Sequence, residues 1–126
     1  MLLPSVRDGF TIGIFGSNGK TSTASFLCGI FNSTGLTSLF VTDEENCVYE
    51  KNMANIETYK KLKNQIKSDI IVIEITEKIL KTDMLNDIDF DMLIHCSISE
   101  GSYEKSPDGI NKINSIINSS KNIKTV

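Results

Sequence analysis

The chain carries an apolar run, Phe10-Thr11-Ile12-Gly13-Ile14-Phe15, that leads directly into Gly16-Ser17-Asn18-Gly19-Lys20-Thr21. The apolar run predicts a buried strand, and the residues after Thr21 have helical spacing, so the glycine-rich stretch is expected to turn from a strand into a helix. Glycines let backbone N–H groups approach an anion closely, where a side chain would block them. This order is typical of a phosphate-binding loop and predicts that the chain binds a nucleoside triphosphate.

Two side chains beside the glycines suit a bound triphosphate. Lys20 can reach the terminal phosphates as a point charge, and the Thr21 hydroxyl is placed to bind a magnesium ion. The general pattern G-x-x-x-x-G-K-[ST] is matched incompletely, because position 14 is isoleucine and the nearest glycine is Gly13. The simpler alternative is a turn that only caps the helix, with Ser17 or Asn18 as the N-cap. Two glycines and an adjacent lysine favour phosphate binding over capping alone.

A carboxylate is expected to complete the magnesium site. The run Asp69-Ile70-Ile71-Val72-Ile73-Glu74 is the most apolar of the chain and rich in β-branched residues, which predicts a buried central strand that ends in an acid. If this strand lies beside the first one, Glu74 reaches the phosphate loop and shares a Mg²⁺ ion with Thr21. The alternative is that Glu74 only caps a helix, or that it lies at a solvent-exposed end of the strand.

The alternation of strands and helices predicts an α/β fold, with helices on both faces of a mostly parallel sheet of about five strands. Strands are expected at residues 10–15, 36–42, 69–74, 90–96 and from 122, and residues 52–55 are expected to lie in a loop. The expected helices follow Thr21, cover residues 56–66, begin after Thr76, and begin at Ser106. We expect one three-layer α/β/α domain over residues 1–126.

The phosphate loop resembles the shorter pattern G-[ST]-x-G-K-[ST] of the Mur ligases and of the folylpolyglutamate and cyanophycin synthetases. The strand before it, the Thr-rich helix start after it, and Glu74-Ile75-Thr76 also resemble that family. The resemblance implies the ATP-binding central domain of an ADP-forming amide-bond ligase, with ATP and Mg²⁺ as cofactors and Lys20 and Glu74 as catalytic residues. The implied nucleotide-binding residues are Gly16, Ser17, Asn18, Gly19, Lys20, Thr21 and Ser22, and the implied metal ligands are Thr21 and Glu74.

The chain departs from the Mur ligases at their second metal site. Where the family carries an Asp-His pair, the chain has Gly101 and Ser102, and His95 lies about seven positions too early to act as that histidine. Glu100 is the nearby carboxylate available to substitute for the pair. Residues 52–55 stand where the family has paired threonines, and we expect the adenine-contacting segment and the amino-acid domain to lie beyond Val126. The resemblance therefore implies a phosphate-binding loop without the complete set of metal-binding and substrate-binding residues that a ligase uses.

The length, charge and composition of the chain argue against several classes of binding partner. The 126 residues suit one domain, and the net charge of −3 argues against nucleic acid bound through bulk charge. The chain shows neither a signal-peptide core nor a membrane-spanning run, so we expect a cytoplasmic location and no membrane partner. The three cysteines, Cys28, Cys47 and Cys96, have no paired C-x-x-C spacing and predict no zinc site.

Three functions are consistent with these features. The first is an ATP- and Mg²⁺-binding domain of a Mur-ligase-like enzyme, catalytic only when joined to further ligase domains. The second is a stand-alone nucleotide-binding module that acts as a regulator or protein partner. The third is an unrelated small phosphate-loop kinase or NTPase, for which the absence of an Asn-Lys-x-Asp motif counts against GTP.

Overall fold

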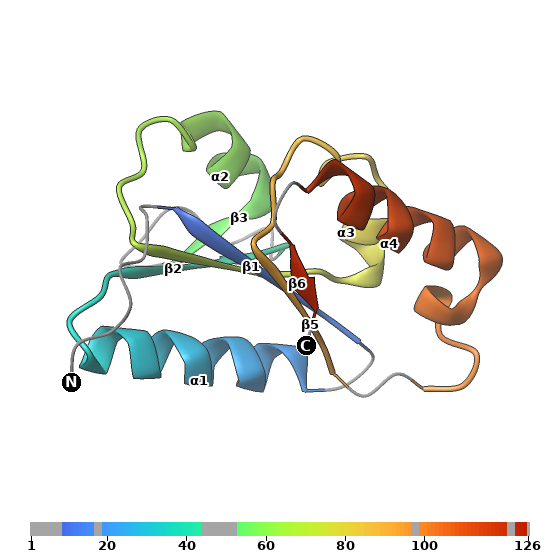
Figure 1. The fold of residues 1–126 in the computed structure, drawn as a ribbon, viewed down its shortest axis with the longest axis horizontal. Helices are drawn as coiled ribbons and strands as arrows, with labels where there is room; N and C mark the ends of the chain where they lie inside the picture. Colours follow the sequence, from blue (N-terminus) through green and yellow to red (C-terminus); the bar gives the residue numbers. More distant parts are fainter. Residues whose placement is uncertain (1–8, 17–18, 44–52, 97–98, 121–122, 126) are drawn as a thin grey trace.

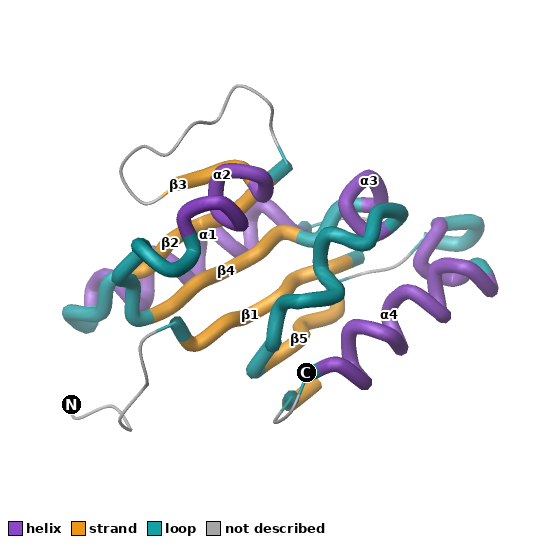
Figure 2. The backbone as a smooth tube through the Cα atoms, turned by 90° about the horizontal axis from the view of Figure 1, so that it is seen from above, coloured by secondary structure: helices purple, strands orange, loops and turns teal. Residues whose placement is uncertain are grey.

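A computed structural model describes residues 9–16, 19–43, 53–96, 99–120 and 123–125. In these ranges a parallel sheet of six strands lies between helices on its two faces (Figures 1 and 2), in the order β3-β2-β4-β1-β5-β6. The strands are β1 (Phe10–Phe15), β2 (Ser38–Thr42), β3 (Met53–Asn55), β4 (Ile70–Glu74), β5 (Met92–His95) and β6 (Lys124–Thr125). The helices are α1 (Lys20–Ser33), α2 (Ile56–Leu62), α3 (Glu77–Leu80) and α4 (Pro107–Ser119), with a 3-10 turn η1 (Tyr103–Lys105) before α4.

The three-layer α/β/α prediction is confirmed, and so is the placement of β4 directly beside β1. The loop predicted around Met53–Asn55 was wrong, because these residues form β3 and pair with Phe40–Thr42 of β2. A strand of three residues is too short to produce the alternation that identifies strands in a sequence. The sheet therefore has one strand more than the five expected.

Alternate side chains of the central strands enter two separate cores. Ile12 and Ile14 of β1, with Ile70 and Val72 of β4, pack beneath α1. On the opposite face, residues of β1, β2, β4 and β5 pack against α2, α3 and α4. Because both faces are covered, β1 and β4 read as continuous apolar runs rather than as alternating ones.

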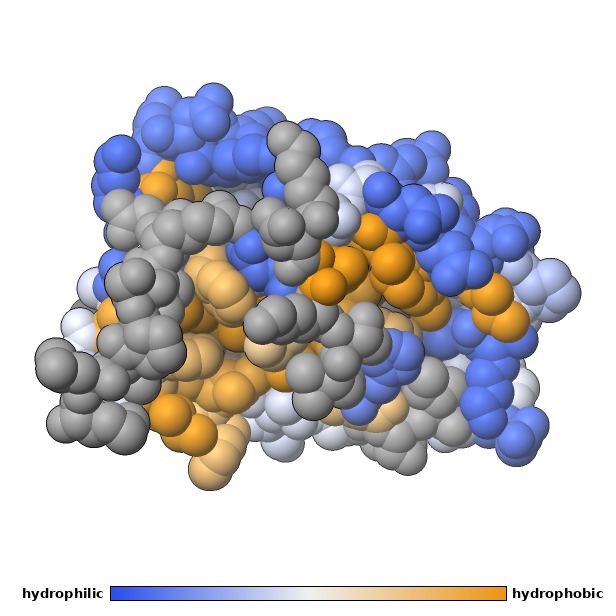
Figure 3. All heavy atoms as spheres, viewed as in Figure 1, coloured by the Kyte–Doolittle hydropathy of each residue, from blue (hydrophilic) through white to orange (hydrophobic). Residues whose placement is uncertain are grey.

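The outer surfaces of the two helical layers differ. Phe26 and Ile30 of α1 are 71% and 42% exposed, and Figure 3 shows apolar surface along this helix. The surface over α2 is hydrophilic in the same view, and its last turn carries Lys60 and Lys61. The surface over α2 is thus hydrophilic, whereas the outer face of α1 is largely uncharged.

Gly13 serves packing inside β1. A Cβ atom at this position would lie 2.7 to 2.9 Å from side-chain atoms of Leu93, Phe90 and Ile75, closer than packed carbon atoms approach one another. These three side chains cover the middle of β1, so the glycine allows them to close over the strand. In the sequence, Gly13 reads only as a displaced loop glycine, because a glycine pattern does not reveal what packs against it.

We expect Gly13→Ala to lower the free energy of unfolding by about 1–3 kcal/mol, because the added methyl group overpacks the core. Urea denaturation monitored by circular dichroism measures this change. Gly29→Ala is the matched control: Gly29 lies on α1, and a methyl group added to it would meet no described atom within 4 Å. That substitution should be neutral or stabilise by up to about 1 kcal/mol through helix propensity. Equal effects at the two positions would contradict the packing explanation.

Candidate functional site

The predicted phosphate loop joins the end of β1 to the start of α1. Gly16, directly after β1, has φ 139°, and Gly19, directly before α1, has φ 85°. Both values lie where residues with side chains are strained. A Cβ atom on Gly16 would also come within 2.8 Å of the Cys96 carbonyl oxygen, so the exit of β5 closes one side of the turn. Ser17 and Asn18 lie outside the described residues.

Among the described residues, no side chain caps the first turn of α1, in contrast to the other α-helices. Its N-cap residue is Gly19, which has no side chain to accept from the helix, and the turn contains no acidic residue. Side chains of Asn55, Thr76 and Ser106 cap α2, α3 and α4. The N-cap position is Gly19, and Ser17 and Asn18, the alternative N-cap residues, lie outside the described residues. Backbone N–H groups at the start of a helix attract anions, and no described side chain caps those of α1.

Thr21 and Glu74 meet at the mouth of this loop. The Thr21 hydroxyl donates a hydrogen bond to Glu74 Oε2 over 2.9 Å, although the residues are far apart in sequence. The pairing of β1 with β4 places Glu74 opposite Ile14, one residue before the end of β1. Glu74 also shares the side-chain parity of Ile70 and Val72, so its carboxylate faces the α1 side of the sheet.

The two oxygen atoms fit a shared Mg²⁺ ion. Neighbouring ligands of an octahedral Mg²⁺ ion, each about 2.1 Å from it, lie about 3 Å apart. The separation of Thr21 Oγ1 and Glu74 Oε2 is close to that value. Glu74 is only 8% exposed, so few water molecules compete for it. A hydroxyl and a carboxylate are also the oxygen ligands that Mg²⁺ prefers.

Lys20 lies beside the same loop. Its Nζ atom donates to the carbonyl oxygen of Gly16 over 2.5 Å, so the ammonium group lies against the loop backbone. The side chain is partly buried. The charge is thus positioned next to the uncapped first turn of α1, where an anion would be bound.

The residues considered for a second metal each make other contacts. His95 is exposed at the end of β5, its ring packs against Phe15 at 4.1 Å between centroids, and partial burial lowers its pKa. The Glu100 side chain is 96% exposed and pairs with Lys105. Ser102 donates to the buried Glu104. The described residues contain no group of three or more His, Cys, Asp or Glu placed to hold a metal ion.

Asp43 is a site residue that the sequence did not single out. It lies directly after β2, is partly buried and accepts a hydrogen bond from Thr76 over 2.6 Å. Beside it lies a hollow of about 300 Å³ between α2 and α3, lined in part by Asn55, Glu57 and Lys78. The position of Asp43 directly after a buried strand could have identified it, because the carboxyl ends of parallel strands meet at one edge of the sheet.

Comparison with known proteins identifies the domain type. The Mur ligase middle domain matches residues 14–105, which include the loop, Glu74 and β5. No curated protein matches the chain. Among the described residues, no helix is long and apolar enough to span a membrane.

We expect Thr21→Val to lower the free energy of unfolding by about 1–3 kcal/mol, because the buried Glu74 carboxylate loses its donor. Thr21→Ser keeps a hydroxyl at this position and should recover most of the loss. Both values come from urea denaturation without nucleotide or metal. If Thr21→Val and Thr21→Ser both unfold with the same free energy as the natural chain, this hydrogen bond does not form in solution.

Proposed function

Because the chain belongs to the Mur ligase family, we propose that it is the ATP- and Mg²⁺-binding domain of an ATP-dependent amide-bond ligase. One observation carries this proposal: Thr21 and Glu74 meet 2.9 Å apart beside a glycine loop whose helix start is capped by no described side chain. A helix cap alone would not need a buried carboxylate from another strand. A shared metal ion next to a phosphate group does need one.

We assign the phosphates and the metal of Mg²⁺-ATP to separate groups of the loop. The backbone N–H groups from Gly16 to Ser22, including those of Ser17 and Asn18, receive the phosphates. Lys20 exchanges the Gly16 carbonyl for a phosphate oxygen, which is a charge-assisted and therefore stronger hydrogen bond. Thr21 and Glu74 hold Mg²⁺, which neutralises phosphate charge when it is bound.

The chemistry of such a ligase has two steps. The γ-phosphoryl group of ATP passes to a substrate carboxylate, which gives an acyl phosphate and ADP. An amine then attacks the acyl carbon, and phosphate and a proton leave as the amide forms. In the first step the ammonium of Lys20 stabilises negative charge on the transferred group, and the fixed loop holds that group in line.

We further propose that the domain is catalytically incomplete alone. Gly101 and Ser102 stand where the family has an Asp-His pair, Glu100 is paired with Lys105, and His95 packs against Phe15. Sites for the carboxylate and the amine would come from further ligase domains or a partner protein. These features also favour the second candidate, a nucleotide-binding module that regulates a partner. The family match favours both over an unrelated kinase or NTPase.

We expect Lys20→Ala to weaken binding of Mg²⁺-ATP at least tenfold, which corresponds to about 1.4 kcal/mol. Isothermal titration calorimetry on the whole chain measures the dissociation constant. Lys61→Ala is the matched control, since Lys61 is an exposed lysine of α2 and takes no part in the loop. An unchanged constant in Lys20→Ala would refute the phosphate-loop assignment.

The chain alone should not form amides at a ligase rate, for which about 1–1,000 turnovers per second are typical. A Cβ atom on Gly19 would meet no described atom within 4 Å, so the loop is open on that side and water would reach an acyl phosphate. ADP release with panels of carboxylic acids and amines measures this. Amide formation at such a rate by the chain alone would overturn the proposed incompleteness. Without turnover, restored activity on adding the missing ligase domains supports the first candidate over the regulator.

A further inference from the structure

A second hollow lies at the opposite end of the sheet from the phosphate loop. It has a volume of about 410 Å³ and is lined by the start of β1, the end of α2 with the residues after it, and residues 87–89. Its lining includes Thr11, Tyr59, Lys63, Lys67, Ile71 and Ile88. β1 begins at this hollow and ends at the loop, so an occupant here would not compete with ATP.

Tyr59 is a buried side chain of this hollow that carries a hydroxyl group. The residue is only 4% exposed, yet within the described part of the chain its hydroxyl forms no hydrogen bond. No fully buried side-chain oxygen or nitrogen of the described residues lacks a partner, so this hydroxyl opens onto the hollow. Burial, with a smaller contribution from the charge of Asp87, raises the pKa of Tyr59. The phenol therefore stays protonated at neutral pH and is available as a donor.

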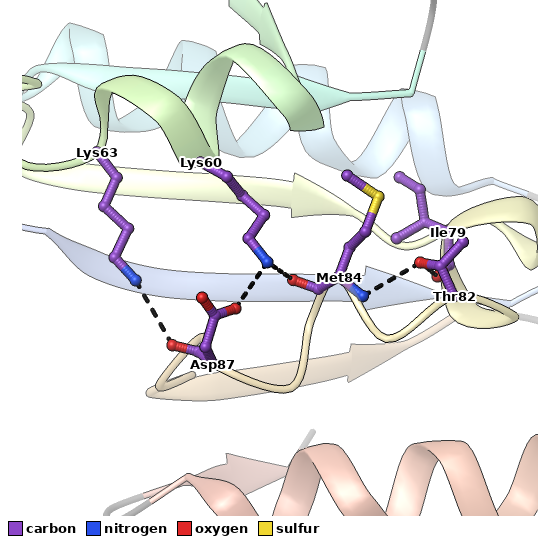
Figure 4. A network of polar contacts seen from close by, with 6 residues as sticks. All are labelled: Lys60, Lys63, Ile79, Thr82, Met84 and Asp87. Carbon is purple, nitrogen blue, oxygen red and sulfur yellow. Dashed lines mark hydrogen bonds and ion pairs between the residues drawn. The ribbon is translucent and has the colours of Figure 1, made fainter.

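The charges around the hollow leave positive charge unmatched. Asp87 already accepts from Lys60 Nζ at 2.8 Å, and Figure 4 shows Lys60 of α2 and Lys63, directly after α2, both directed toward Asp87. Lys63 reaches only the Asp87 carbonyl oxygen, at 3.5 Å, which is a weak contact. Asp89 has a partner of its own. Lys67 is exposed and pairs with no group in the described ranges.

The remaining wall is apolar. Ile71 of β4 and Ile88 are buried core residues, and Ile66 packs against the same core. The hollow thus combines an apolar wall with two lysines and one phenol that lacks a partner among the described residues. An inorganic ion would use the lysines but leave the apolar wall in contact with water.

We propose that this hollow binds a small organic anion, with its carboxylate or phosphate group held by Tyr59, Lys63 and Lys67 and its apolar body against Ile71 and Ile88. Tyr59 donates to the anion, and the two lysines balance its charge. The proposal is independent of ATP binding at the loop.

The test uses benzoate and phenyl phosphate, which share one apolar body, and benzyl alcohol as the uncharged comparison. Each is titrated into the whole chain, followed by amide ¹H–¹⁵N correlation spectra. We expect either anion to shift the amides of Thr11, Lys63 and Ile71, and benzyl alcohol to bind at least tenfold more weakly. The two anions together show which head group the hollow prefers.

Variants test the assigned contacts. Tyr59→Phe removes one hydroxyl and should weaken anion binding at least about fivefold, because a hydrogen bond to a charge is lost. Its melting temperature should not fall, since no hydrogen bond between described residues is lost. Replacing Lys63 and Lys67 together by methionine should weaken binding at least about tenfold. Lys61→Met, at an exposed lysine of α2 that does not line the hollow, should change nothing.

Several results would overturn the proposal. Absent shifts around the hollow, or equal binding of benzyl alcohol and the anions, would rule out anion recognition there. Unchanged anion binding in Tyr59→Phe would show that the Tyr59 hydroxyl does not donate to the anion. Shifts confined to Lys20 and Thr21 would mean that phenyl phosphate occupies the phosphate loop instead.

Discussion

The hydrogen bond between Thr21 and Glu74 depends on the parallel pairing of β1 with β4. That pairing places Glu74 opposite Ile14, and the alternation of side chains directs its carboxylate toward α1. A shift of one residue in register would send the carboxylate to the opposite core. The apolar residues that fill both cores fix this register, so the packing of the sheet determines whether one metal ion can be shared.

The sequence was sufficient for the parts of the site that depend on local pattern. The glycines, Lys20 and Thr21 lie within one turn, and the acid at the end of the most apolar strand follows from the rule that parallel strands present their carboxyl ends together. The contact of Asp43 with Thr76 was missed because it joins two residues far apart in the sequence, and no local pattern links them. β3 was missed because three residues show no period, and the role of Gly13 was missed because it depends on three distant side chains.

The two ends of β1 have different chemistry. At its carboxyl end the loop offers N–H groups and a lysine beside a buried carboxylate, an arrangement suited to a phosphate with its metal. At its amino end Tyr59 and two lysines line an apolar hollow, where the carboxylate of Asp87 is already paired with Lys60. The family match, over residues 14–105, includes residues of both ends and so does not by itself separate their roles.

The central claim is that Glu74 acts through a Mg²⁺ ion shared with Thr21. Calorimetric titration of ATP into the natural chain and into Glu74→Gln, each with and without Mg²⁺, tests it most directly. We expect Mg²⁺ to tighten ATP binding to the natural chain at least about tenfold and to have little effect on Glu74→Gln. Without Mg²⁺ the variant should bind ATP at least as well, because a negative charge near the phosphates is gone. A full Mg²⁺ effect in Glu74→Gln would contradict a shared ion.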